Sequence, residues 1–256
     1  MKLNKDNYFS REMQRKYMGV SQFKAFDACE AAALAEINGT YQREQTPALL
    51  IGSYVDAWFE GTLDAFTQAY PELFKRDGSL KAEYQAAERV IERVRRDSLF
   101  MSYMSGEKQV ILTGEIEGVP IKIKVDALHP DKIVDLKVMR SFDPVYKSGE
   151  GRLCWIEAWG YDIQGAVYQE IVRQNTGGRL PFYLAAATKE PEPDIEIVHI
   201  SQPYLDAALD RVRESIQRYD AIKAGAIDPL GCGHCRYCRG KKVLHTPIEM
   251  EDLFDE

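Results

Sequence analysis

The chain has 256 residues, 45% of them hydrophobic and 29% charged, which is the composition of a globular protein with a substantial core. No run approaches the roughly 18 consecutive apolar residues of a membrane span. Residues 1–19 are too polar for a secretory signal, so we expect a cytoplasmic protein with no membrane partner. The net charge of −7 argues against a protein that coats nucleic acid through bulk electrostatics, but it leaves room for an enzyme that handles nucleic acid in a local cleft.

The first part of the chain predicts helices. Apolar residues recur at helical spacing in three segments, which are residues 20–37, 48–61 and 81–98. Ser21 is placed to cap the first of these helices, which carries Phe23, Phe26 and Ala33. The third segment is charged and amphipathic.

The second part of the chain predicts strands and helices in alternation. Two strands in residues 109–128 are joined by a turn at Glu117 and Gly118. The elements expected after them are a strand at 132–139, a helix at 154–175, strands at 182–189 and 195–200, and a helix at 203–225. This order predicts one α/β domain with a mixed sheet flanked by helices. We divide the single domain, 1–256, into a helical region at 1–100, a core at 101–225 and a cysteine-containing segment at 226–256.

Charged residues interrupt two apolar strands near the middle of the chain. Because side chains alternate across a strand, one face is expected to be apolar, with Ile121, Ile123, Val125 and Ala127, and the other charged, with Lys122, Lys124 and Asp126. In the next strand, Asp135 and Lys137 share the face opposite Val134, Leu136 and Val138. Antiparallel pairing would put Asp126, Asp135 and Lys137 on one polar side. The pattern alone fits a metal site or an ordinary solvent-facing hairpin.

Two carboxylates and an ammonium group on one patch fit the chemistry of phosphodiester hydrolysis. Carboxylate oxygens suit Mg²⁺ or Mn²⁺, which bind through a few carboxylates together with substrate phosphate. Such an ion generates hydroxide and neutralises charge on the scissile phosphate. Lys137 would orient the attacking water or stabilise the developing negative charge.

Neighbouring segments supply further motifs in a fixed order. Tyr161, Gln164 and Tyr168 share a helix face, as do Gly52 and Asp56. The motifs are GSYVD at 52–56, VDAL at 125–128, VDLK at 134–137 and YDIQGAVY at 161–168. Together they resemble the PD-(D/E)XK nuclease superfamily, and within it the RecB-like and RecE-like exonucleases. The resemblance runs from about residue 18 to 240 and implies a restriction-endonuclease-like core.

The resemblance implies a role for each matching residue. Asp126 and Asp135 would be metal ligands and Lys137 the catalytic lysine, while Gln164 and Tyr168 would contact substrate or support the site. Glu107 is a looser match to an acidic residue that such enzymes have before the hairpin. Asp56 departs from the pattern, because histidine is typical there, although aspartate is also a hard metal ligand.

Simpler interpretations remain open at these positions. Asp56 fits a surface carboxylate of a helix, and Gln164 and Tyr168 fit a helix face that forms hydrogen bonds inward. Lys122 and Lys124 could touch DNA phosphates, although a solvated strand face is the simpler interpretation.

Cys232, Cys235 and Cys238 form a C-x₂-C-x₂-C motif, in which local crowding of thiols points to metal rather than to disulfides. Some RecB-like nucleases tie an N-terminal cysteine to a C-terminal cysteine trio around a [4Fe–4S] cluster, and this layout implies Cys29 as the fourth ligand. Zinc and three free thiols are the alternatives. His234 is a poor candidate for a ligand, and Cys154 is expected to be a small buried residue.

The resemblance implies a metal-dependent deoxyribonuclease. The expected activity is digestion of one strand of linear duplex DNA from an end, which would leave single strand for an annealing protein. Enzymes of this type often form homo-oligomeric rings. A DNA- or protein-binding module without catalysis and an endonuclease that acts on branched or single-stranded DNA are the alternatives.

Overall fold

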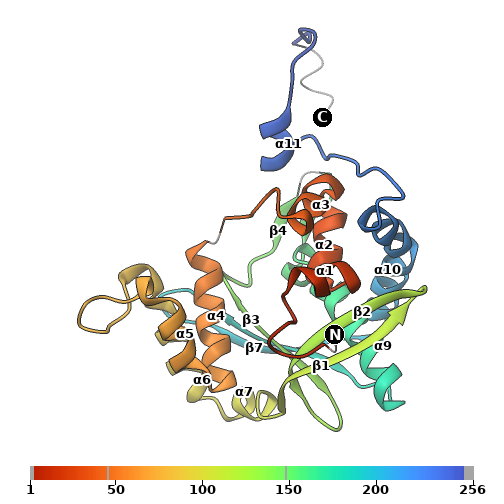
Figure 1. Cartoon of the computed structure of the whole chain (residues 1–256). Helices are drawn as coiled ribbons and strands as arrows, with labels where there is room; N and C mark the ends of the chain where they lie inside the picture. Colours follow the sequence, from red (N-terminus) through yellow and green to blue (C-terminus); the bar gives the residue numbers. More distant parts are fainter. Residues whose placement is uncertain (1–2, 45, 148, 251–256) are drawn as a thin grey trace.

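We describe a computed structural model of the chain that covers residues 3–44, 46–147 and 149–250; the two ends of the predicted domain, 1–2 and 251–256, lie outside the described residues (Figure 1). The helices are α1 (Arg11–Lys16), α2 (Val20–Ala28), α3 (Glu30–Asn38), α4 (Pro47–Glu60), α5 (Leu63–Ala69), α6 (Ala86–Arg95), α7 (Ser98–Tyr103), α8 (Trp155–Ala158), α9 (Tyr161–Thr176), α10 (Gln202–Lys223) and α11 (Arg236–Lys241), with 3₁₀ turns η1 (Pro71–Leu73) and η2 (Ala82–Tyr84). The strands are β1 (Glu107–Ile116), β2 (Val119–Leu128), β3 (Ile133–Met139), β4 (Val145–Lys147), β5 (Gly151–Leu153), β6 (Phe182–Thr188) and β7 (Ile195–Ile200).

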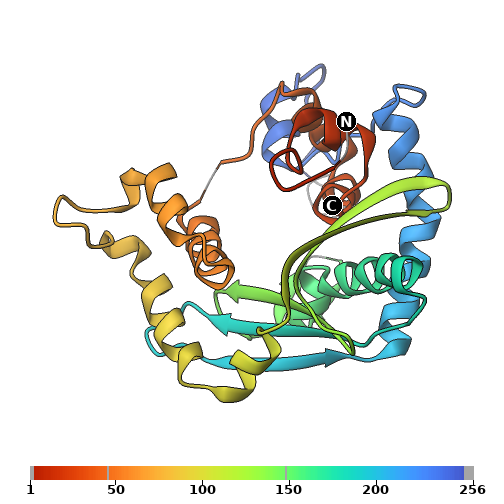
Figure 2. The ribbon, with the colours of Figure 1, turned by 60° about the horizontal axis from the view of Figure 1, so that its bottom comes forward.

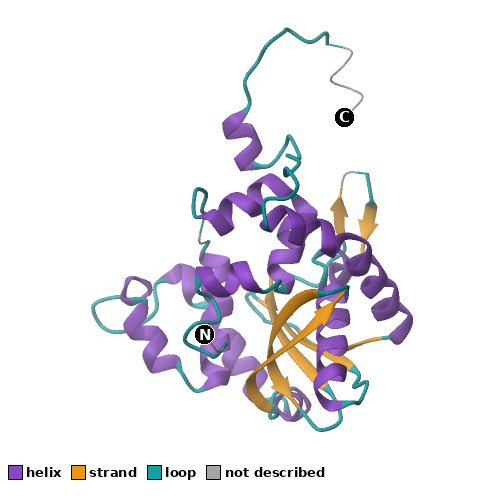
Figure 3. Cartoon of the chain, turned by 45° about the vertical axis from the view of Figure 1, so that its right-hand side comes forward, coloured by secondary structure: helices purple, strands orange, loops and turns teal. Residues whose placement is uncertain are grey.

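Within the described residues, five strands form a mixed sheet in the order β1-β2-β3-β6-β7. The pair β3–β6 is parallel and the other neighbours are antiparallel, which confirms the predicted α/β class with mixed strand directions. The β1–β2 turn falls at Glu117 and Gly118, both with positive φ, as a tight two-residue hairpin requires. Strands β4 and β5 form a separate small hairpin that the sequence did not predict (Figure 3).

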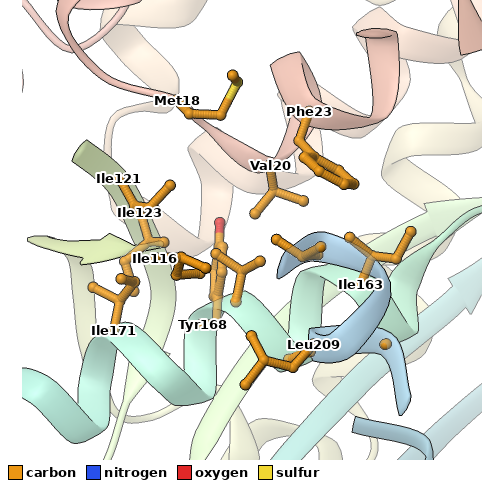
Figure 4. Packing of buried hydrophobic residues seen from close by; sticks show 14 of the residues in the cluster. Met18, Val20, Phe23, Ile116, Ile121, Ile123, Ile163, Tyr168, Ile171 and Leu209 are labelled. Carbon is orange, nitrogen blue, oxygen red and sulfur yellow. The ribbon is translucent and has the colours of Figure 1, made fainter. Parts of the chain in front are cut away.

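Helices cover both sides of the sheet. In Figure 2 the helices between residues 47 and 103 lie on one side, and α9 and α10 lie on the other. The first side contains a buried cluster of α4, α6 and α7 residues against Val134 and Leu136 of β3. The second contains residues of α2, α9 and α10 packed against β2, among which Figure 4 shows Tyr168 close to Ile123. No helix in the described part of the chain is long and apolar enough to cross a membrane.

The helix boundaries differ from the predicted ones at three places. The expected helix at 20–37 is divided into α2 and α3 by extended backbone at Cys29, and Gly19 rather than Ser21 is its N-cap. The expected helix at 154–175 is divided at Gly160, whose φ of 61° is left-handed. The third predicted helix, 81–98, is shorter, because a 3₁₀ turn precedes α6 and a new helix begins at residue 98.

Strand β2 pairs with β3 only at its C-terminal end, and the separation of the two strands before that point creates room for a site. The two strands pair through Ala127 with Val134 and Leu128 with Ile133. Ala127 therefore packs in the cluster of α4 and α6, whereas Ile123 and Val125 pack against α9. The expectation that Ala127 shares a face with Ile123 and Val125 is wrong. The alternation of side chains is interrupted at Asp126, so the side chain of Ala127 points to the opposite side of the sheet from those of Ile123 and Val125.

Candidate active site

Acidic and basic side chains from four elements line one pocket of about 520 Å³. Helix α4 contributes Asp56 and Glu60, strand β2 contributes Lys124 and Asp126, strand β3 contributes Asp135 and Lys137, and helix α2 contributes Lys24. Gln164 and Tyr168 of α9 also line it. The pocket thus collects residues from each of the four sequence motifs, which lie far apart in the chain.

Asp135 is the most enclosed carboxylate of the pocket. Asp135 is only 1% exposed, so the interpretation of this stretch as a solvent-facing hairpin is wrong at this residue. The side-chain amide of Gln164 donates a hydrogen bond of 2.6 Å to Asp135 Oδ1, and Lys137 forms an ion pair with Oδ2. Burial raises the pKa of Asp135 to about 6, and the negative charge of Asp126 acts in the same direction, while Lys137 opposes it.

Asp126 connects the separated strands. Its Oδ2 accepts a hydrogen bond of 2.9 Å from the backbone N–H of Leu136, so the carboxylate takes the place that a strand partner would fill. Its Oδ1 accepts a bond of 3.2 Å from the side-chain amide of Gln109 on β1. Asp126 is half-buried and lines the same pocket as Asp135 and Lys137, as the sequence predicts.

Lys137 lies among carboxylates and an aromatic ring. Burial alone would lower its pKa, but Asp135 and Asp126 outweigh burial and raise the pKa of Lys137 above its ordinary value. Its Nζ lies 5.0 Å from the centroid of the Tyr161 ring, within the range of a cation–π contact. The ammonium group is therefore charged at physiological pH.

Asp56 faces the other carboxylates from α4. Burial raises the pKa of Asp56 well above its ordinary value, and Asp126 and Asp135 raise it further. It is half-buried and lines the pocket, so it is not a surface carboxylate of the helix. Glu60, one turn further along, lies 3.9 Å from the ammonium group of Lys124, and burial raises the pKa of Glu60 as well.

Tyr168 joins α9 to β2. Its hydroxyl donates a hydrogen bond of 3.0 Å to the backbone carbonyl of Lys124, and Figure 4 shows that the hydroxyl points away from the helix. Together with the bond from Gln164 to Asp135, this contact fixes the distance between the helix and the two strands that carry the carboxylates. Both residues therefore form hydrogen bonds inward and also line the pocket.

The sequence matches the family described as a PDDEXK-like domain of unknown function (DUF3799) over residues 19–241. The chain belongs to this family. A crystal structure of a protein from Eubacterium rectale, provisionally named an exonuclease, matches with a TM-score of 0.93 at 48% sequence identity, covering 99% of this chain and 98% of that one. No curated protein matches the sequence. The resemblance to the PD-(D/E)XK superfamily is confirmed, and the family and fold support a nuclease.

The donor types in the pocket of the PDDEXK-like domain are those that a hard divalent cation prefers, although among the described residues only the four cysteines already lie close enough together to hold a metal ion. Asp56, Asp126 and Asp135 present carboxylate oxygens to one pocket, and burial, with a smaller effect of the neighbouring carboxylates, raises the pKa of both Asp56 and Asp135. The side-chain oxygen of Gln109 is buried there without a hydrogen-bond partner among the described residues. A cation bound between these oxygens would relieve the crowding of charge.

Glu107 is the one predicted ligand that the structure does not bring to the pocket. It is exposed at the start of β1, opposite Leu128. Gln109, two residues later, contacts Asp126 instead and has a left-handed φ of 55°, which is strained for a residue with a side chain. The predicted hairpin turn contained the signal for Gln109, because counting back from Glu117 and Gly118 places residue 109 opposite residue 126.

Two lysines differ from what the sequence predicts: Lys24 lines the pocket although no motif indicated it, and Lys122 is buried although a solvated position was expected. The ammonium group of Lys24 donates a hydrogen bond of 3.0 Å to the carbonyl of Trp159, and burial, with Lys137 nearby, lowers the pKa of Lys24 to about 8. Lys122 is 1% exposed, so the solvated strand face is wrong for this residue. The N-terminal segment covers it, and its ammonium group donates to the carbonyl of Tyr8. Lys124 remains half-buried at the pocket.

The predicted cysteine group is also brought together. The sulfur atoms of Cys29, Cys232, Cys235 and Cys238 all lie within 4.8 Å of one another, an arrangement that could hold a metal ion. Cys154 is exposed at the start of α8, so the expectation of a buried residue is wrong. The adjacent Trp155 is buried in its place, because the helix start turns the indole rather than the thiol inward.

Proposed function

We propose that this PDDEXK-like domain is a Mg²⁺- or Mn²⁺-dependent deoxyribonuclease that hydrolyses linear duplex DNA from its ends. The observation that carries the proposal is the meeting of Asp126, Asp135 and Lys137 in one pocket. The provisional name of the Eubacterium rectale protein supports the choice of an exonuclease. Asp126, Asp135 and Asp56 would hold the cation, which supplies Lewis-acid activation of water and neutralises phosphate charge when bound.

The protein's own residues position the reacting groups. Gln164 orients Asp135 through a hydrogen bond to Oδ1, and the Leu136 N–H orients Asp126 through a hydrogen bond to Oδ2. Lys137, charged at physiological pH, would hold the attacking water and stabilise negative charge on the phosphate oxygens. Lys24 and Lys124 would contact neighbouring DNA phosphates from the pocket wall.

Cleavage of end-labelled linear duplex, beside closed circular duplex of the same sequence, tests this function. We expect Mg²⁺-dependent shortening of the linear substrate only, no activity in excess EDTA, and loss of activity in Lys137→Met. The matched control is Lys242→Met, which replaces an exposed lysine of the C-terminal segment. DNA binding without cleavage in any divalent cation would contradict the proposal and favour a binding module, while cleavage of the circle would favour an endonuclease.

A further inference from the structure

The four clustered cysteines come from opposite ends of the chain. Cys29 lies at the break between α2 and α3, where its backbone is extended. Cys232 and Cys235 precede α11, and Cys238 lies within it. The sulfur atoms of Cys29 and Cys238 are 3.6 Å apart, although the residues are 209 positions apart in the sequence. The fold therefore presents four sulfur ligands to one small volume.

Backbone groups prepare the sulfurs of the loop for a cation. The N–H of Cys235 donates to the sulfur of Cys232 at 3.3 Å, and the N–H of Cys238 donates to the sulfur of Cys235 at 3.4 Å. Hydrogen bonds of this kind stabilise thiolate sulfur, which is the form that binds metal. Gly233, with a φ of 80°, allows the tight turn between the first two cysteines.

The spacing of the sulfurs distinguishes one ion from a cluster. Around a tetrahedral ion with metal–sulfur bonds of about 2.3 Å, neighbouring sulfurs lie about 3.8 Å apart. In a [4Fe–4S] cluster each cysteine binds a different iron atom and the cube lies between them, so the cysteine sulfurs are roughly 6 Å apart. The observed separation of 3.6 Å, and the upper limit of 4.8 Å for every pair, match the single ion and leave no space for the cube.

We propose that Cys29, Cys232, Cys235 and Cys238 hold one tetrahedral zinc ion, and not an iron–sulfur cluster. Four thiolates in a closed arrangement are a usual structural zinc site, and such a site binds Zn²⁺ more tightly than Fe²⁺. Nothing in this proposal depends on the nuclease pocket, so its failure would leave the proposed function untouched.

The ion would fasten the C-terminal segment to the N-terminal helices. Around it, the backbone N–H of Leu230 donates to Glu30 at 2.7 Å, and the N–H of Ala31 donates to the carbonyl of Leu230 at 3.0 Å. Arg218 of α10 holds the same Glu30 carboxylate through two hydrogen bonds of 2.7 and 2.8 Å. Since α2 ends directly at Cys29, and Lys24 of α2 lines the nuclease pocket, the zinc ion also fixes the helix that carries Lys24.

Metal and sulfide content of the full chain tests the assignment. The protein would be purified without oxygen from cells supplied with both iron and zinc, and analysed for zinc, iron and acid-labile sulfide. We expect about one zinc ion per chain and no labile sulfide. Cys29→Ser should lose zinc and Cys154→Ser, the exposed control, should keep it; if Cys29→Ser is insoluble, Cys232→Ser on the loop replaces it. Iron with sulfide, iron alone, or protein without metal would each overturn the proposal.

A second measurement tests whether the zinc ion connects the C-terminal segment to the N-terminal helices. Hydrogen exchange of residues 29–38 and 226–241 would be compared before and after zinc removal by a chelator. We expect exchange to become faster in both segments together, because one ion connects them, while exchange in β6 stays unchanged. Unaltered exchange in both segments after complete zinc removal would overturn the structural role.

Discussion

The side-chain amide of Gln164 lies 2.6 Å from Oδ1 of Asp135, and this bond fixes the carboxylate that is most deeply buried in the pocket. The other oxygen of Asp135 is ion-paired with Lys137. Asp135 is therefore held from both sides before any cation or DNA phosphate reaches it. A residue that orients a metal ligand in this way contributes to affinity without contacting the reacting atoms.

Replacing Gln164 should weaken cation binding more than it weakens folding. In Gln164→Leu we expect Mn²⁺ affinity and nuclease activity to fall about 10- to 100-fold, because Asp135 loses the donor that orients it. Isothermal titration with Mn²⁺ and the linear-duplex assay measure the two effects. Gln42→Leu, at an exposed position in the segment between α3 and α4, is the control and should match the wild type. Equal losses in both variants would contradict the orienting role of Gln164.

Removing Lys137 should destabilise the protein as well as inactivate it. Lys137→Met leaves Asp135 buried without its cation, which we expect to lower the free energy of unfolding by roughly 3 kcal/mol. The double variant Asp135→Asn with Lys137→Met removes both charges and should regain most of that stability, but no activity. Urea denaturation and the cleavage assay separate these outcomes. A double variant no more stable than the single one would show that the ion pair is not the cause.

Tyr168→Phe tests the connection between α9 and β2. The variant keeps the ring but removes the hydrogen bond to the Lys124 carbonyl, so we expect a loss of about 1 kcal/mol in the free energy of unfolding. Tyr204→Phe, at an exposed position of α10, should change it little. Thermal unfolding followed by circular dichroism measures both. A Tyr168→Phe variant as stable as the control would mean that this bond contributes nothing to the packing of α9.

Alkaline stability should depend on Lys122. Burial, together with the charge of Lys223, lowers the pKa of Lys122 to about 8 in the folded protein. Between pH 8 and about 10 the folded state releases this proton while the unfolded chain, with the ordinary lysine pKa of about 10.4, retains it. Across this window the unfolded state binds more protons than the folded state, so the contribution of Lys122 to the free energy of unfolding rises with pH.

Urea denaturation at several pH values checks this dependence. Measured against Lys122→Met, which has no titrating group at this position, the wild type should gain stability as the pH rises from 8 to 10. Lys242→Met, at an exposed position, should follow the wild type throughout. A constant difference between wild type and Lys122→Met over this range would contradict a lowered pKa for Lys122.

Short-range patterns predicted the centre of the pocket, because strand alternation and helix periodicity depend only on neighbouring residues. They placed Asp135 and Lys137 on one face of a strand and Gln164 and Tyr168 on one face of a helix. The same rules failed at Ala127, because the pairing of β2 with β3 begins only after Asp126, and the side chain of Ala127 points to the side of the sheet that α4 and α6 cover. Nothing in the local sequence marks that separation.

The errors concern contacts between distant parts of the chain. Lys122 is buried because the segment around Tyr8 folds over it, and alternation in β2 cannot show what covers the strand. At the helix break at Cys29, the chain contacts residues 230–238. At the break at Gly160, the absence of a side chain allows Lys24 to approach, because a Cβ added to Gly160 would lie 2.9 Å from Lys24 Cδ. Periodicity within each helix has no information about either contact.

Direct titration of Mn²⁺ into the protein tests the central claim, which is that the carboxylates of Asp126 and Asp135 coordinate a divalent cation in the pocket next to Lys137. Isothermal calorimetry of the wild type should show binding that is lost in Asp126→Asn and in Asp135→Asn, and kept in Asp131→Asn, a carboxylate exposed in the β2–β3 turn. Binding of equal affinity in the wild type and in both pocket variants would contradict the account.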